Sequence, residues 1–167
     1  IAGGTDDPAY PTIEKAGIPV LADAEFLESD PLGRAEWIKY FAALTGTEQQ
    51  ATSTFDKIST DYQALVSKAE GAKAKELLVS QPYQGTWSMP AGGSYAGQLL
   101  GDARGSWPWQ SDTSTGSVSA DNETVLDKSG KATLWINTAN WKSKSEALKE
   151  EPRFKNFAAF SSGQVWS

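Results

Sequence analysis

The chain has 167 residues, and its 21 Asp and Glu exceed its 15 Lys and Arg, so the formal net charge at pH 7 is −6. The cations form no basic stripe, which makes nucleic acid an unexpected partner. Cys and His are both absent, which excludes disulfides, thiolate metal sites, Ser-His-Asp catalysis and His-ligated haem.

The first 46 residues alternate between strand and helix patterns. Residues 1–4 are predicted to end a buried strand, and residues 8–16 to form a short helix that stops at Gly17. The apolar run at 18–21 predicts a short parallel strand. Because the chain starts inside a predicted element, we expect a partial chain whose signal region lies outside it.

Two helices with clear end signals follow. Asp30 is predicted to cap the first helix, with Pro31 at its first position, and Gly46 to stop it. Thr47 and Gln50 fit a capping box that opens the second helix. Its apolar residues fall on one stripe about six turns long, formed by Ala51, Phe55, Ile58, Tyr62, Leu65, Val66 and Ala69.

The rest of the chain returns to α/β alternation. Strands are predicted at 77–79, 133–137 and 164–166, and helices at 94–103, 122–128 and 143–150, with a further turn at 152–157. The intervening segments 81–93 and 106–119 are predicted as turn-rich or loop. This order implies a mainly parallel sheet with right-handed crossovers.

Several stretches carry a family resemblance over nearly the whole chain. They are AGIPV at 16–20, PLGRAEWI at 31–38, WSMPAGGSY at 87–95, NETVL at 122–126 and ATLWIN at 132–137. Together with the long helix, they resemble the periplasmic substrate-binding proteins of ABC importers that take up iron-siderophores or cobalamin. In that class a single long helix joins two α/β lobes.

The resemblance implies an α/β fold: a three-layer lobe with a mainly parallel sheet plus a long bridging helix, similar to class III periplasmic binding proteins and present in part. Residues 1–46 would be a remnant of the N-terminal lobe, 47–70 the bridging helix and 71–167 an incomplete C-terminal lobe. The truncated lobe surfaces would expose apolar groups and favour self-association.

The same resemblance implies a transport function and no enzymatic activity. The protein would bind a ferric siderophore or a corrinoid in an aromatic-lined cleft between the lobes and deliver it to an ABC permease in the membrane. It would need no cofactor and no structural metal. Its location would be periplasmic, or extracytoplasmic and membrane-anchored.

Aromatic residues near the end of the predicted strand at 77–79 are the first candidates for ligand contact, because ligands of open α/β sheets sit at carboxyl ends of strands. They are the aromatic residues Tyr83, Trp87 and Tyr95, together with Met89. Gly92 and Gly93 would let the backbone approach a ligand, and the helix start after them favours an anionic group. The alternative is a turn packed on its own aromatics.

Two further segments supply candidates. In the loop 106–119, whose counterpart faces the cleft in the family, they are Trp107, Trp109 and Thr113, with Ser114 and Thr115 as further hydrogen-bond donors. After the strand at 133–137 they are Asn137 and Trp141, together with Thr138 and Asn140. The alternatives are a Trp that covers the core edge and an Asx-type turn before Ser143.

Glu123 is, by resemblance, the glutamate of the second lobe that pairs with an arginine of the permease. An exposed carboxylate can form such a bidentate pair. The alternative is a solvated glutamate that the dipole of its helix favours. Trp37, Trp135 and Trp166 occupy apolar positions inside predicted elements, and we expect them in the core.

Two other function classes compete with transport. A Trp-rich carbohydrate-binding module would use the seven Trp, although such modules are usually all-β and the helical periodicity here opposes that. A carboxylate-based hydrolase would need converging acids. The pairs Asp6-Asp7 and Glu150-Glu151 are adjacent in sequence and are not expected to converge.

Overall fold

The computed structural model describes residues 7–137, 139 and 141–166. The strand end expected at 1–4 and the candidates Thr138 and Asn140 lie outside the described residues. The chain forms two compact units, Ile1–Ser59 and Thr60–Ser167. Their boundary falls inside the long helix α4, Glu48–Glu70.

The described part of the first unit is helical. It contains α1 (Tyr10–Lys15), a 3₁₀ turn (Glu25–Leu27), α2 (Pro31–Glu36), α3 (Ile38–Thr45) and the start of α4. Asp30 caps α2 as predicted, since its carboxylate accepts a hydrogen bond from the Gly33 N–H at 2.6 Å. The helix predicted from Pro31 onward divides at Trp37, whose N–H bonds back three residues to Arg34 at 3.4 Å, as in a 3₁₀ turn.

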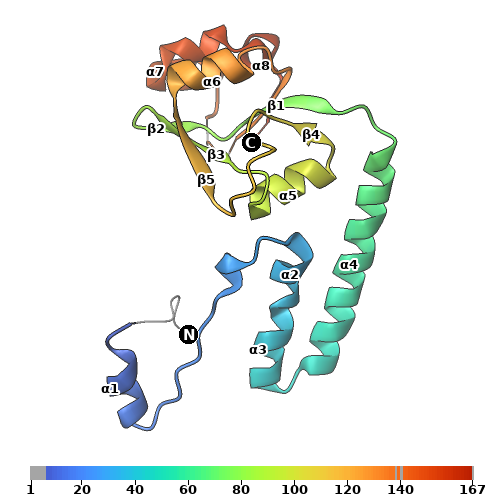
Figure 1. Cartoon of the computed structure of the whole chain (residues 1–167), viewed down its shortest axis with the longest axis vertical. Helices are drawn as coiled ribbons and strands as arrows, with labels where there is room; N and C mark the ends of the chain where they lie inside the picture. The colour runs from blue at the N-terminus through green and yellow to red at the C-terminus, as the bar shows by residue number, and fades with distance from the viewer. Residues whose placement is uncertain (1–6, 138, 140, 167) are drawn as a thin grey trace. The chain divides into compact units, whose positions relative to one another are not determined.

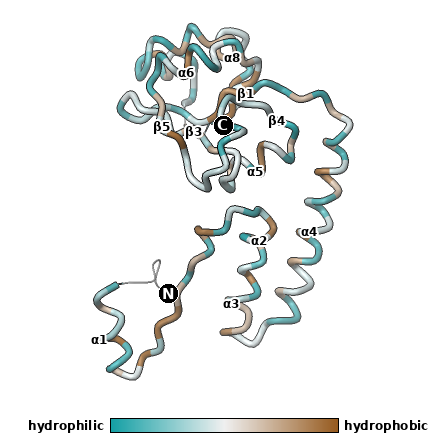
Figure 2. Tube along the Cα trace, viewed as in Figure 1, coloured by the Kyte–Doolittle hydropathy of each residue, from teal (hydrophilic) through white to brown (hydrophobic). Residues whose placement is uncertain are grey.

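The strand predicted at 18–21 does not form. These residues belong to no described helix or strand, and Ile18 and Leu21 are 57% and 39% exposed. The segment between α1 and α2 is hydrophobic along much of its trace (Figure 2). A parallel strand needs hydrogen-bonded neighbours, and both sheets of the described structure take all their strands from residue 75 onward. Hydrophobicity alone therefore misidentified this segment.

Helix α4 has 23 residues, so at 1.5 Å per residue it is about 34 Å long. Ala51 is buried and Phe55, Tyr62 and Val66 are half-buried along one stripe. The Lys39 ammonium lies 4.2 Å from the Phe55 ring centre. Farther along, the Tyr62 hydroxyl donates to Asp102 at 2.5 Å. The helix thus contributes side chains to both units.

The second unit contains two sheets (Figure 1). The first is parallel, in the order β4-β1-β6-β7, formed by Gly105–Ser106, Lys75–Val79, Leu134–Ile136 and Val165–Trp166. The second is antiparallel, in the order β2-β3-β5, formed by Pro82–Tyr83, Thr86–Pro90 and Ser117–Asp121. The parallel sheet confirms the predicted α/β fold.

The antiparallel sheet corrects two loop predictions. The segment 81–93 contains the β2–β3 hairpin, and the loop predicted at 106–119 ends in β5. Pairing of Tyr83 with Thr86 leaves Gln84 and Gly85 as the turn, with φ of 50° and 82°. This is the two-residue turn that matches strand twist. Short strands with a turn glycine were read as turns alone.

Four helices surround these sheets: α5 (Tyr95–Asp102), α6 (Asn122–Ser129), α7 (Lys144–Glu150) and α8 (Ala158–Ser162). A 3₁₀ turn, Pro152–Asn156, precedes α8. In Figure 1, α6, α7 and α8 lie on one side of the strands and α5 on the other. Ser143 caps α7, because its hydroxyl accepts a hydrogen bond from the Glu146 N–H at 3.2 Å.

Residues 77–79 of strand β1 are buried on both faces and organise the core. Leu78 packs into the larger cluster with Trp87, Trp135 and Phe154, whereas Leu77 and Val79 pack on the other side with Trp107. The Trp135 and Phe154 rings are 5.0 Å apart in an edge arrangement. Of the three Trp residues predicted in the core, Trp135 is buried as predicted and Trp37 is half-buried. The prediction for Trp166 is wrong, because its side chain on the edge strand β7 is 62% exposed.

Candidate functional site

The carboxyl ends of β1 and β6 meet at one edge of the parallel sheet. The strands are neighbours, with Val79 opposite Ile136. Beyond them, the Ser80 N–H donates to the Ile136 carbonyl at 2.9 Å, and the Trp135 indole donates to the Ser80 carbonyl at 2.7 Å. The segments after both strands therefore start side by side, at the edge where open α/β sheets bind ligands.

Three of the predicted contact residues are core residues in this structure. Trp87 and Met89 have no exposed surface and Trp107 is 5% exposed. The Trp107 indole donates to the Pro90 carbonyl at 2.7 Å. Their positions fit the alternative predicted for them, aromatics packed on their own turn and on the core edge.

Gly92 and Gly93, which precede α5, allow the backbone of the loop at 110–114 to pack closely against them. A Cβ at Gly92 would collide with the Gln110 carbonyl, and one at Gly93 would lie 2.8 Å from the Ser114 carbonyl. The loop after Trp109 thus occupies the space in which a ligand was expected. Gly92 donates to the Trp109 carbonyl at 3.1 Å, which fixes this packing.

The remaining candidates in these segments are more accessible. Tyr83 is 77% exposed at the hairpin, Thr113 is exposed, and Tyr95 and Trp109 are half-buried. Trp109 packs against both core clusters. None of these four residues lines the pocket that lies beyond the carboxyl end of β6, beside Asn137.

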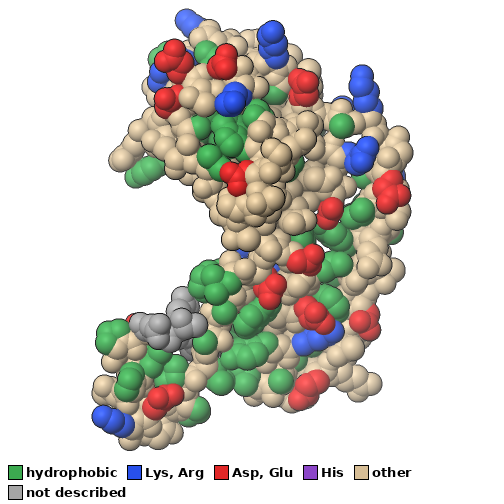
Figure 3. Space-filling view, in the orientation of Figure 1, with side chains coloured by type: hydrophobic (Ala, Val, Ile, Leu, Met, Phe, Trp, Pro, Cys, Tyr) green, Lys and Arg blue, Asp and Glu red, His purple; other side chains and the backbone are tan. Residues whose placement is uncertain are grey.

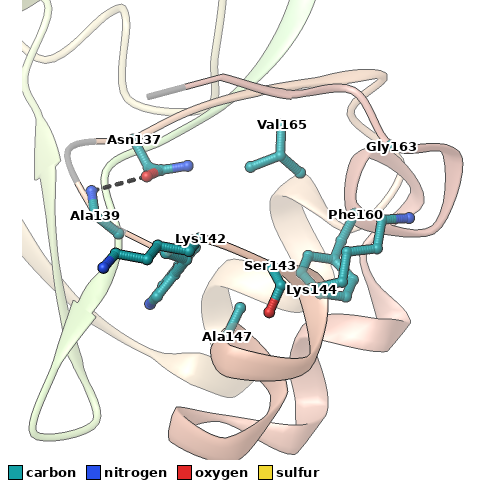
Figure 4. A pocket seen from close by; sticks show the side chains of 10 residues that line it. Asn137, Ala139, Lys142, Ser143, Lys144, Ala147, Phe160, Gly163 and Val165 are labelled. Carbon is teal, nitrogen blue, oxygen red and sulfur yellow. Dashed lines mark hydrogen bonds between the residues drawn. The ribbon is translucent and has the colours of Figure 1, made fainter.

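Asn137 and Trp141 do come together, in a pocket of about 200 Å³ beyond the end of β6. The other lining residues are Ala139, Lys142, Ser143, Lys144, Ala147, Phe160, Gly163 and Val165 (Figure 4). Lys142 and Lys144 extend on opposite sides of it. Lys142 and Lys144 are close to Trp141 in the sequence, so sequence reasoning could have identified them. Phe160 and Val165 belong to α8 and β7, and no local sequence pattern connects these elements with Asn137.

The Asn137 side chain is held at the floor of this pocket. It is 6% exposed, and its Oδ1 accepts a hydrogen bond from the Ala139 N–H at 2.8 Å. Its Nδ2 is buried and has no hydrogen-bond partner among the residues that the structure describes. The Asx-type turn predicted as the alternative is therefore present, and it leaves the amide donor unused.

Glu123 is exposed on the first turn of α6, beside a partly buried network. The Trp87 indole donates to Asn122 at 2.7 Å, the Asn122 amide donates to Glu151 at 3.2 Å, and Arg153 donates to Glu151. Sequence reasoning did not identify this network, because its members come from three separate segments.

Hydrogen bonds from Arg153 hold the pKa of Glu151 below its usual range. Reciprocally, Glu151, and to a smaller degree Glu123, raise the pKa of Arg153. The network thus keeps an ion pair next to the exposed Glu123 carboxylate.

Figure 3 shows cationic and anionic side chains interspersed on the visible face of the second unit. Across the described residues, no group of three or more acidic side chains is placed to hold a metal ion. No helix in the same part of the chain has the length and apolarity to cross a bilayer.

Residues 5–167 match the family described as periplasmic binding protein. An uncharacterized lipoprotein of Methanocaldococcus jannaschii is 29% identical over 156 residues, which covers 92% of this chain and 37% of that protein. A second lipoprotein of that organism is covered to 43%, so the chain spans about two fifths of the curated relatives it matches.

Solved structures share the fold. The periplasmic heme binding protein HutB of Vibrio cholerae aligns with a TM-score of 0.72 and 16% identity, over 97% of this chain and 63% of that one. A binding protein component of a ferrichrome ABC transporter from Bacillus subtilis aligns with a TM-score of 0.64 and 19% identity, over 94% of this chain and 60% of that one.

Proposed function

The chain belongs to the periplasmic binding protein family, whose members bind solutes and are not enzymes, and on that premise we propose that it serves an ABC importer as its extracytoplasmic solute-binding component. The proposed solute is an iron complex, such as a ferric siderophore or haem, or a corrinoid. The protein would release it to the permease in the membrane.

One observation carries the proposal beyond the family: the pocket at the carboxyl edge of β1 and β6. It joins the aromatic ring of Trp141 to the polar side chains of Asn137 and Ser143 and to the cationic side chains of Lys142 and Lys144. Aromatic walls with a few convergent polar groups are typical of small-molecule sites. The names of the solved structures, a heme binding protein and a ferrichrome transporter component, support iron complexes as the ligand class.

The test is a fluorescence titration of the protein in its natural length with haemin, ferric citrate, ferrichrome and cyanocobalamin. We expect saturable quenching by one of them, and a smaller quench in a Trp141→Phe variant, because Trp141 lines the pocket. Trp166→Phe is the control, since Trp166 is exposed and is not a lining residue. Absence of saturable quenching by all four complexes would contradict the proposal.

We further propose that Glu123 contacts the permease. It is exposed on α6, and a carboxylate presented there can pair with an arginine of a partner. Glu123→Ala should lower uptake by cells while leaving ligand affinity unchanged, because charged contacts of this kind steer and orient docking. Asp127→Ala, an exposed acid on the same helix, should leave uptake unchanged. A loss of ligand affinity in Glu123→Ala would reject this assignment.

The location follows from the family as extracytoplasmic. Attachment to the membrane is a proposal supported by the lipoprotein name of the curated relatives. A lipid-modified protein should partition into detergent phase in a phase-separation assay of cells that express it.

A further inference from the structure

We infer that the pocket beside Asn137 binds a carboxylate group of the transported complex, so that the ligand is a carboxylate-bearing metal complex. This inference rests on the proposed function and narrows its ligand class. It is carried by the unused amide donor of Asn137, by the cations at the rim and by the size of the pocket.

The amide donor has a fixed direction. Oδ1 of Asn137 is occupied by the Ala139 N–H at 2.8 Å, so the opposite end of the same amide, Nδ2, is turned away from that turn. Figure 4 shows Nδ2 pointing toward Val165, which is one of the residues that line the pocket. A buried donor without a partner destabilises the folded chain. An oxygen acceptor brought by a ligand would remove that penalty.

The other polar groups at the pocket favour an anionic acceptor. Lys142 and Lys144 line it, and the Lys144 ammonium is held at the rim by the Ser161 carbonyl at 3.2 Å. None of the described residues that line the pocket is acidic. Two acids next to the pocket bond to lining residues: Glu146 accepts from the Lys142 N–H at 2.8 Å, and Glu150 accepts from the Trp141 indole at 2.7 Å. Both carboxylates therefore already accept a hydrogen bond.

The apolar walls and the volume of the pocket indicate what part of the ligand would carry the carboxylate. Ala147, Phe160 and Val165 give the pocket apolar sides, which suit the methylene stem of an acid side arm. A volume of about 200 Å³ is below the range of pockets that enclose a drug-sized molecule. The pocket therefore takes one acid arm, and the metal centre stays outside it.

Asn137→Asp is the sharpest variant. It keeps the acceptor for the Ala139 N–H and nearly the same shape, but it replaces the unused donor by an anionic oxygen. Charge-assisted hydrogen bonds are the strong ones, so loss of this donor and repulsion by the new carboxylate should weaken binding of haemin and ferric citrate about tenfold or more. Lys144→Gln should weaken both to a smaller extent. Lys155→Gln, an exposed cation outside the pocket, should change neither.

Ferrichrome and cyanocobalamin, which carry no free carboxylate, provide the ligand control in the same titrations. The inference predicts that they bind more weakly than haemin or ferric citrate and that Asn137→Asp does not weaken them. If either binds tightest, or if Asn137→Asp leaves haemin and ferric citrate unchanged while its near-UV circular dichroism matches the parent, the carboxylate site is rejected and the transport function stands. If none of the four complexes binds, both proposals fail.

Discussion

Asn122 is the residue on which the core and the surface of the second unit depend together. It accepts from the buried Trp87 indole and donates to Glu151. Asn122→Ala would leave the Trp87 donor buried without a partner, so we expect a loss of about 1–3 kcal/mol in the free energy of unfolding. Urea denaturation measures it. Asn156→Ala, at an exposed position, should cost less than about 0.5 kcal/mol, and an equal effect of both variants would contradict the role of the network.

The ion pair of Glu151 and Arg153 makes stability depend on pH. The pKa of Glu151 is lowered in the folded chain, first by hydrogen bonds from Arg153, so the unfolded chain binds the proton more readily. The stabilisation is therefore complete above the unfolded pKa of about 4.3 and disappears as pH falls through the lower folded value. The difference in unfolding free energy between the parent and Glu151→Gln should shrink below pH 4.3. A constant difference from pH 7 to pH 3 would contradict this.

Sequence reasoning located Asn137 and Trp141 at a strand end, and the structure places both at one pocket. For Trp87 and Met89 it preferred ligand contact to the alternative of packing, and both side chains are buried. A signal existed, because apolar and polar residues alternate through Thr86–Pro90, the period-two pattern of a strand with one buried face. The unused donor of Asn137 had no signal at all, since it depends on how the amide is oriented.

Helix α5 contains a matched pair of glycines that tests its packing. A Cβ at Gly97 would collide with the Ala91 carbonyl, whereas nothing lies within 4 Å of one at Gly101. Gly97→Ala should destabilise the protein by about 1–3 kcal/mol, and Gly101→Ala should stabilise it by roughly 0.5–1 kcal/mol, because alanine loses less backbone entropy in a helix. The melting temperatures of both variants, measured by thermal unfolding, test these two expectations. Equal shifts in melting temperature would show that α5 does not rest on Ala91.

Elements with strong local signals were predictable, and those defined by neighbours were not. The caps at Asp30 and Ser143 and the long helix α4 follow from adjacent residues. The segment 18–21 shows the opposite case, because an apolar run is compatible with a strand only if other strands flank it. The β2–β3 hairpin was missed because β2 has only two residues.

The two units differ in how much core they contain. Both hydrophobic clusters lie within Thr60–Ser167, whereas the buried residues of the described first unit are Pro31, Ala42 and Ala51. A fragment that starts at Glu48 should therefore unfold cooperatively and retain the near-UV circular dichroism of its packed Trp side chains. Loss of that signal in the fragment would mean that the second unit depends on the first. Self-association of the chain through exposed apolar lobe surfaces stays a prediction.

The family and the α/β fold were accessible from the order of motifs, whereas the solute requires an experiment. The most direct measurement is native mass spectrometry of the protein in its natural length, mixed with haemin, ferric citrate, ferrichrome and cyanocobalamin. The four complexes are added at one equal concentration, which exceeds that of the protein. We predict a single 1:1 adduct whose mass identifies one complex, with the carboxylate-bearing ones preferred. A spectrum that shows only the unliganded protein, at concentrations where each complex is in excess, would contradict the proposed solute-binding function.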